Sequence, residues 1–185
     1  MLHHRAVIAA VALACAGLAA GCATASTAAD RVAAAAVDFV TPTGGSVGSG
    51  VVWQDPLGVV HVDAQVRGLT PGNHGIHFHA VGRCDGAGSL AFASAGAHFN
   101  PANRKHGLSV PDGPHAGDAP TFTVGSDGLG RINFTTDRVS LTGEPTSLND
   151  TDGSSLVIHA MGDDQVTDPS GNSGARIACA VVRMR

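Results

Sequence analysis

The segment HGIHFH, residues 74–79, carries histidines at a spacing that could bind a metal ion. If the segment is a β-strand, its two-residue period places His77 and His79 on one face and Ile76 and Phe78 on the other. Two neighbouring imidazoles on a rigid strand suit zinc or copper. The alternative is a strand whose two histidines face water, and the segment by itself leaves both interpretations open.

Further histidines follow at spacings that favour the metal interpretation. Three lie in a segment rich in glycine, alanine and proline, with an aspartate three residues after the last, and another ends an apolar, strand-like run. His61 lies on the polar face of an alternating segment, which indicates a surface position. With His74 left aside, six imidazoles and a carboxylate exceed one tetrahedral site and predict two metal ions, or one ion with spare ligands. The candidate ligands are His77, His79, His98, His106, His115, Asp118 and His159.

The chain around these residues has the pattern of an all-β protein. Residues 60–67 alternate between apolar and polar side chains, as in an antiparallel strand with one solvated face. Turn residues separate the apolar segments at intervals of about ten residues. We therefore predict a Greek-key β-barrel or sandwich of about eight antiparallel strands. The strands are expected within residues 32–40, 49–55, 60–67, 74–79, 121–125, 131–137, 154–160 and 176–183.

Two segments without periodicity interrupt this pattern, residues 80–119 and 161–174. An irregular segment of about forty residues inside a compact domain is uncommon and usually functional. Its small residues cannot supply a core, so we expect a metal ion and a disulfide to order it. The second segment carries acids but no lysine or arginine.

The N-terminus has the pattern of an export signal. A short basic start precedes an apolar run too short to span a membrane comfortably, and small residues lead to Cys22. We predict a signal peptide over residues 1–22 with lipidation of Cys22, a tether over residues 23–31 and a folded domain over residues 32–185. The lipid would be the protein's membrane contact. Ordinary secretion with cleavage after Ala25 is the alternative, and both routes export the protein.

Export gives the cysteines an interpretation. Cys15 would leave with the signal peptide and Cys22 would carry the lipid, which leaves Cys84 and Cys179. An oxidising compartment favours a disulfide between them, and two unpaired buried thiols are the alternative. The formal net charge of −4, without a basic stripe, argues against nucleic acid as a partner.

Five segments resemble, in order, the signature blocks of copper,zinc superoxide dismutase in its exported bacterial form: HGIHFHAVGRCD, SAGAHFNPANRKHG, PDGPHAGD, LVIHAMGDD and GNSGARIACAVV. The resemblance covers the chain from about Val32 to the C-terminus. It implies an enzyme that disproportionates the small anion superoxide to dioxygen and hydrogen peroxide, in antioxidant defence outside the cytoplasm. It also implies one copper and one zinc per chain, and it leaves a homodimer open.

The resemblance assigns roles residue by residue. It implies copper ligands at His77, His79, His98 and His159, and zinc ligands at His98, His106, His115 and Asp118, with His98 as a bridging imidazolate that takes up and releases a proton. Arg176 matches an arginine beside the copper that attracts superoxide. Asp163 matches an aspartate that hydrogen-bonds to ligands of both metals, and Cys84 and Cys179 match the family's disulfide. His74 matches a structural histidine and is left out of the metal ligands.

Two other functions are weighed against the enzyme. The chain could be an exported copper- and zinc-binding lipoprotein that acts as a metal buffer or carrier, or a secreted β-sandwich that binds metal incidentally. Loss of His159 or Arg176 would favour the carrier, and both residues are present. Three loop histidines and Asp118 have no other reason to lie in an alanine- and glycine-rich loop. We therefore predict the enzyme.

Overall fold

In the computed structural model, which describes residues 30–143 and 145–185, the chain is built from β-strands, and its described part contains no α-helix. The elements are β1 (Ala33–Val40), β2 (Ser46–Gln54), β3 (Val60–Arg67), β4 (Gly72–His74), β5 (Ile76–His79), the 3-10 helix η2 (Ala93–Ala95), β6 (Phe122–Val124), β7 (Leu129–Thr136), β8 (Ser155–His159), β9 (Arg176–Val181) and β10 (Arg183–Met184).

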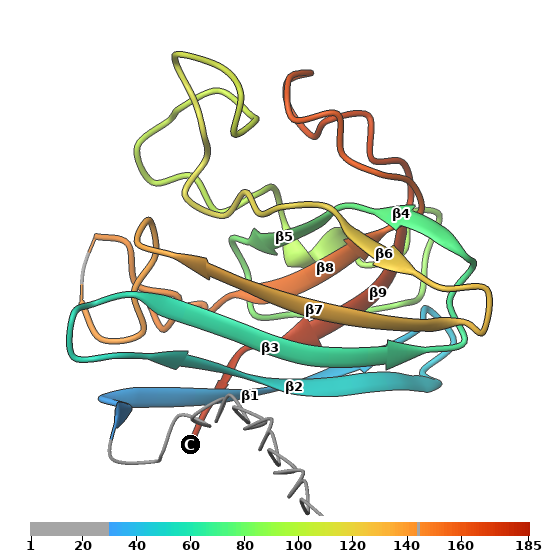
Figure 1. The fold of residues 1–185 in the computed structure, drawn as a ribbon, viewed down its shortest axis with the longest axis horizontal. Coiled ribbons are helices and arrows are strands. Elements are labelled where there is room, and N and C mark those ends of the chain that lie inside the picture. The colour runs from blue at the N-terminus through green and yellow to red at the C-terminus, as the bar shows by residue number, and fades with distance from the viewer. Residues whose placement is uncertain (1–29, 144) are drawn as a thin grey trace, which may run out of the picture.

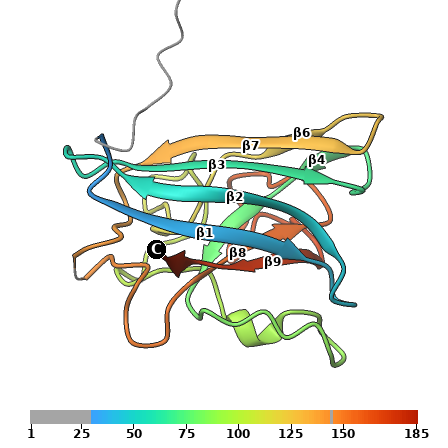
Figure 2. The same ribbon diagram turned by 90° about the horizontal axis from the view of Figure 1, so that it is seen from below.

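The strands form one antiparallel sheet that curls into a nearly closed barrel (Figures 1 and 2). Its order is β4-β6-β7-β3-β2-β1-β9-β8-β5, and β10 pairs with β1. The two end strands, β4 and β5, are consecutive in the chain and are separated by Gly75 alone. β1 also pairs with β9, and β5 pairs with β8, so the chain crosses between distant strands as in a Greek key. The predicted all-β Greek-key barrel is confirmed.

Alternation along the strands produces the barrel core. In β3 the apolar residues at every second position from Val60 to Val66 are buried, and the polar residues between them face outward. Equivalent residues of the other strands, such as Phe39, join them in one apolar cluster. On the outer face, the ring of His61 stacks on Trp53 with a centroid distance of 3.8 Å. His61 is therefore outside the histidine group, as predicted.

The segment HGIHFH is not one strand, and that part of the prediction is wrong. The segment is interrupted at Gly75, where the chain passes from one end of the sheet to the other. The part before Gly75, β4, pairs with β6, and the part after it, β5, pairs with β8. A Cβ atom at Gly75 would lie 3.0 Å from the Cβ of Ser173 and 3.3 Å from the Cε1 of His77, so the crossing is tight. This break and the short β10 give ten strands in the described residues instead of about eight.

Both faces of β5 are covered. Ile76 and Phe78 join the barrel core, and His77 and His79 lie against the long loop, to which isolated β-bridges join them. The exposure of each histidine is 0%. The alternative in which these histidines face water is therefore wrong.

Two long loops rise from the same side of the barrel (Figure 1). Residues 80–119 contain η2 and are otherwise irregular, as predicted, and their yellow-green part stands beside the orange-red segment 161–174. Both loops lie over the side of the barrel that carries β5 and β8. The loops and these two strands therefore enclose a common region.

The predicted signal peptide, the lipid acceptor Cys22 and most of the tether lie outside the described residues. The last tether residue, Arg31, places its guanidinium 5.0 Å from the centroid of the Trp53 ring. Among the residues that the structure describes, no helix has the length and apolar character needed to cross a membrane.

Candidate metal centre

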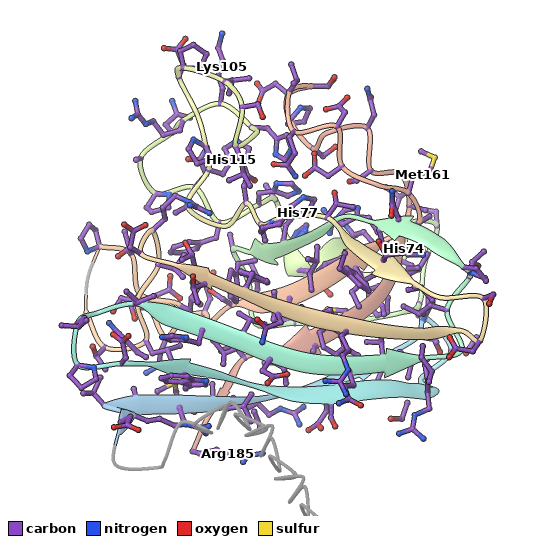
Figure 3. All side chains as sticks on the ribbon, viewed as in Figure 1. His74, His77, Lys105, His115, Met161 and Arg185 are labelled. Carbon is purple, nitrogen blue, oxygen red and sulfur yellow. A yellow bond between two sulfur atoms is a disulfide. The ribbon has the colours of Figure 1, made fainter. Side chains whose placement is uncertain are left out.

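Histidines from two strands and from the long loop meet at the junction of barrel and loops. β5 carries His77 and His79, and β8, which pairs with β5, ends at His159. The backbone N–H of His159 donates to the carbonyl oxygen of Gly75, which fixes the end of β8 beside the start of β5. Figure 3 shows His77 at this junction, with His115 above it in the long loop.

The first group consists of four buried imidazoles whose ligand atoms lie within 4.8 Å of one another: His77, His79, His98 and His159. One nitrogen of each ring is buried without a hydrogen-bond partner, Nδ1 in His77 and Nε2 in the other three. An unsatisfied buried polar atom costs about 1–3 kcal/mol. Four such atoms converging on one volume fit a bound cation, and an all-imidazole donor set suits copper or zinc.

The opposite ring nitrogen fixes the orientation of two of these ligands. Nδ1 of His79 lies 3.0 Å from the carbonyl oxygen of Gly96, and Nδ1 of His159 lies 3.1 Å from that of Gly174. A carbonyl oxygen only accepts hydrogen bonds, so each Nδ1 carries the proton and each Nε2 presents a lone pair. The two rings are thus held in the tautomer that can ligate a metal.

The second group is centred on Asp118, which has 1% exposure. Its Oδ1 lies 3.1, 3.0 and 3.3 Å from the Nδ1 atoms of His98, His106 and His115, and the Nδ1 atoms of His98 and His115 are 3.4 Å apart. Ligands held about 2.0–2.1 Å from a tetrahedral zinc ion are separated by about 3.3–3.4 Å. The spacing of these four atoms fits such an ion.

Two histidines lie near both groups. His98 directs Nδ1 to Asp118 and leaves Nε2 unpartnered in the first group, so it can contribute to both. His77 also has a ligand atom within 4.8 Å of His98, His106 and Asp118. However, its Nε2 is engaged by Asp163, so its free Nδ1 belongs with the unpartnered nitrogens of the first group.

Asp163 connects the two groups from the loop 161–174. Its Oδ2 accepts a hydrogen bond from Nε2 of His77 at 2.7 Å, and its Oδ1 accepts one from Nε2 of His106 at 3.0 Å. Its side chain is fully buried. The backbone N–H of Gln165 also donates to Oδ1, at 2.6 Å. One carboxylate therefore orients a ring of each group.

Asp118 is itself held by the backbone and by an arginine. Its Oδ2 accepts the N–H groups of Gly107, at 2.8 Å, and His115, at 3.0 Å. Nη2 of Arg138 donates to its carbonyl oxygen at 2.7 Å. These contacts fix the carboxylate so that Oδ1 faces the imidazoles.

Burial and hydrogen bonding shift the pKa values of the candidate ligands in opposite directions. Burial disfavours the charged ring and lowers the pKa of His98 to about 4 and that of His159 to about 3. Burial also opposes the charged form of His106, but hydrogen bonds to Asp118 and Asp163 outweigh it and raise its pKa to about 9. The same hydrogen bonds outweigh burial and lower the pKa of both carboxyls below their usual range. At neutral pH the rings of His98 and His159 are uncharged and can donate lone pairs.

Arg176 lies beside the first group, on β9. Its Nη1 and Nη2 donate to the carbonyl oxygens of Phe92, at 2.6 Å, and Gly96, at 2.7 Å. The Gly96 carbonyl also contacts His79, so the guanidinium and this imidazole share an anchor. Arg176 lines a cleft of about 640 Å³, whose other lining residues are Ser89, Leu90, Ala91, Ala93, Gly96, Ala97, Gly174 and Ala175. It is the charged residue of that lining, so the cleft carries a positive charge.

Comparison with known proteins identifies the family of this constellation. The family model described as copper/zinc superoxide dismutase matches residues 47–182. The chain belongs to the copper/zinc superoxide dismutase family. Superoxide dismutase [Cu-Zn] of Deinococcus radiodurans is 42% identical over 157 residues, covering 78% of this chain and 81% of that protein. The family is one of enzymes that act on superoxide, and the chain is a superoxide dismutase by this relationship.

Solved structures of the family agree with the fold. The copper/zinc superoxide dismutase from Brucella abortus matches with a TM-score of 0.66 and 29% identity, covering 81% of this chain and 99% of that one. A double mutant of a superoxide-dismutase-like protein from Bacillus subtilis matches with a TM-score of 0.74 and 37% identity, covering 80% of this chain and 96% of that one. In that mutant a tyrosine and a proline are replaced by histidine.

A disulfide joins the long loop of this family member to β9. Cys84 and Cys179 are bonded, with their Cα atoms 5.6 Å apart, as predicted. Cys84 begins the segment that contains Phe92 and Gly96, the acceptors of the Arg176 guanidinium. The disulfide therefore holds this segment against the strand that carries Arg176.

Each of the seven predicted ligands lies in one of the two groups, and His74 lies in neither. The ring nitrogens of His74 contact the carbonyl oxygens of His159 at 2.7 Å and Thr70 at 2.8 Å, as suits a structural residue. The supporting contacts of Gln165 and Arg138 are missing from the sequence prediction. Arg138 reaches Asp118 from another loop, and the Gln165 side chain donates to the carbonyl oxygen of Ala119, 46 residues away; no local pattern indicates either contact.

Proposed function

We propose that this chain dismutates superoxide with copper held by His77, His79, His98 and His159 and zinc held by His98, His106, His115 and Asp118. The observation that carries the proposal is the convergence of four buried, unpartnered imidazole nitrogens beside a tetrahedral cluster centred on a carboxylate. Copper bound there would alternate between two oxidation states and exchange one electron with each superoxide ion.

The residues of the chain supply position and protons. His98 would join the two metals, and its Nε2 is the atom proposed to hold a proton in one half of the cycle and to release it in the other. Asp163 would fix the orientation of the His77 and His106 rings by accepting hydrogen bonds from their Nε2 atoms. Arg176, anchored beside His79, would draw the anionic substrate to the first group.

The compartment proposed for this activity lies outside the cytoplasm. A signal peptide over residues 1–22 and lipidation of Cys22 would anchor the domain of residues 32–185 through a short tether, and cleavage after Ala25 would instead release it. The Cys84–Cys179 disulfide supports an oxidising compartment. Replacing Cys22 by serine and fractionating the cells tests the anchor, which fails if variant and parent partition identically.

Metal content and dismutation measured on one sample test the enzyme. The mature protein, expressed with copper and zinc, should contain about one of each metal per chain. It should lose activity when copper is removed. Both metals present without dismutation would instead indicate the buffer or carrier function, and Arg176 with its cleft would be the next place to look.

A further inference from the structure

A metal-bound histidine normally donates its second ring N–H to an acceptor that orients the ring. Most candidate ligands satisfy this rule. His79 and His159 use carbonyl oxygens, and His77 and His106 use Asp163. Each nitrogen of His98 faces one of the two groups, so in the proposed function both nitrogens bind metal and the ring has no N–H that needs an acceptor.

His115 is the exception among the described ligands. Its Nδ1 faces Asp118 and His98 and is the atom proposed to bind zinc, so in the zinc-bound protein the ring carries its proton on Nε2. Oδ1 of Asp168 lies 3.9 Å from this Nε2. This distance is too long for a direct hydrogen bond but suits a bridging water or a small ring rotation.

Asp168 already contacts a second candidate ligand. Its Oδ1 accepts the backbone N–H of His106 at 2.8 Å. Its carboxylate is 55% exposed and lines a cleft of about 660 Å³ that is also bordered by His98, His115 and Asp152. Oδ1 of Asp168 thus lies between the backbone N–H of His106 and Nε2 of His115.

We propose that Asp168 is a positioning residue for the zinc site, which holds His106 through its backbone and orients His115 through Nε2. This inference rests on the proposed function, in which both histidines bind zinc. Asp163 and Asp168 belong to one loop and contact zinc-group histidines at different atoms. The loop 161–174 therefore strengthens zinc binding by orienting the zinc ligands His106 and His115, although none of its own residues is a ligand.

Zinc affinity, measured by competition with a chromophoric chelator, tests the proposal without any use of activity. Asp168→Asn keeps an amide oxygen for the His106 N–H but removes the carboxylate that faces His115. We expect it to raise the zinc dissociation constant about tenfold, the lower end of the range for outer-sphere partners, because the carboxylate is half-exposed. Asp168→Ala, which removes both contacts, should raise it further.

A spectroscopic readout separates positioning from general stability. Cobalt substituted for zinc should show a changed visible spectrum in Asp168→Asn, because the His115 ring is reoriented, while the unfolding midpoint of the metal-free variant equals that of the parent. Asp152→Asn is the matched control, because Asp152 is an exposed residue of the same cleft and its side chain forms no hydrogen bond or ion pair with a candidate ligand among the described residues. It should leave affinity and spectrum unchanged.

The outcomes distinguish this inference from the proposed function. Asp168→Asn with the zinc affinity and cobalt spectrum of the parent would overturn the role of Asp168 and leave the zinc site standing. A parent protein that takes up no zinc would overturn the zinc site itself, and the inference with it.

Discussion

A single methyl group added at Gly171 should disturb both metal groups without changing a ligand. Gly171 has a φ of 62° and lies against the carboxylate that connects the two groups. A Cβ atom there would overlap Oδ1 of Asp163 and lie 2.7 Å from Nε2 of His106. Both atoms form the hydrogen bond that orients His106, so Gly171→Ala must displace one or both.

The expected effect has two parts. An L-residue in the left-handed region costs about 1–2 kcal/mol of folding free energy wherever it occurs. The second part is local, because relieving the overlap requires Asp163 to move by about an ångström or more, away from His77 and His106. Loss of an outer-sphere partner typically weakens metal binding about 10–100-fold. We expect at least this loss for zinc, and weaker copper retention because His77 loses the same partner.

Gly68→Ala isolates the local part. Gly68 has a φ of 72°, and a Cβ atom there would have no atom within 4 Å. Both variants should lose similar stability in the metal-free state, measured by thermal unfolding with a chelator present. Only Gly171→Ala should lose zinc and copper in chelator competition and lose dismutation in proportion. Equal metal affinities in the two variants would refute the assigned role of Asp163.

Three further predictions follow from the site. Arg176→Ala should lower kcat/KM about tenfold or more with both metals retained, because the substrate is an anion; an unchanged kcat/KM at low ionic strength contradicts this role. Replacing Cys84 and Cys179 together by alanine should lower the free energy of unfolding by about 4–5 kcal/mol, measured with guanidinium, because the bond spans 95 residues; an unchanged midpoint would contradict it. The metal-free protein should be most stable near pH 6.5–7, measured as the unfolding midpoint against pH. The pKa of His98 is lowered to about 4, so between pH 4 and the ordinary pKa of about 6.5 the unfolded chain binds more protons at His98, and stability falls as the pH falls. The pKa of His106 is raised to about 9, so its protonation stabilises the fold below about pH 6.5, and this stability is lost as the pH rises towards and past about 9. A midpoint that rises steadily with pH would contradict the assignment of His106.

The sequence was sufficient for features that depend on local pattern. The alternation from Val60 to Val66 predicts β3 and its buried face, because the side-chain period of a strand is two residues. The irregular segment 80–119 is recognisable because its composition cannot form a core. The candidate ligands follow from residue type and from the five family-like segments, and the structure brings them into two groups.

The sequence was insufficient where contacts join distant segments. The break at Gly75 is invisible to periodicity, because both halves of HGIHFH are extended and only the sheet order separates them. Asp168 and Gln165 lie in an acidic loop that resembles any solvated turn. Their side chains contact His106 and Ala119, which are 62 and 46 residues away. Arg138 likewise reaches Asp118 from another loop. Such contacts depend on how the loops fold over the barrel.

The three acidic residues of the loop 161–174 form hydrogen bonds within the protein, which bears on how a net-acidic chain can attract an anionic substrate. Asp163 holds imidazoles of both groups, Asp168 holds the backbone of His106, and Asp164 accepts the N–H of Thr167 at 2.8 Å within the loop itself. All three carboxylates are thus used to shape the loop and the metal groups, and the loop offers no lysine or arginine to steer an anion. The formal net charge of −4 opposes attraction at long range. In the proposed function, attraction therefore acts at short range, from Arg176 in its cleft and from the metal charges that the buried imidazoles would hold.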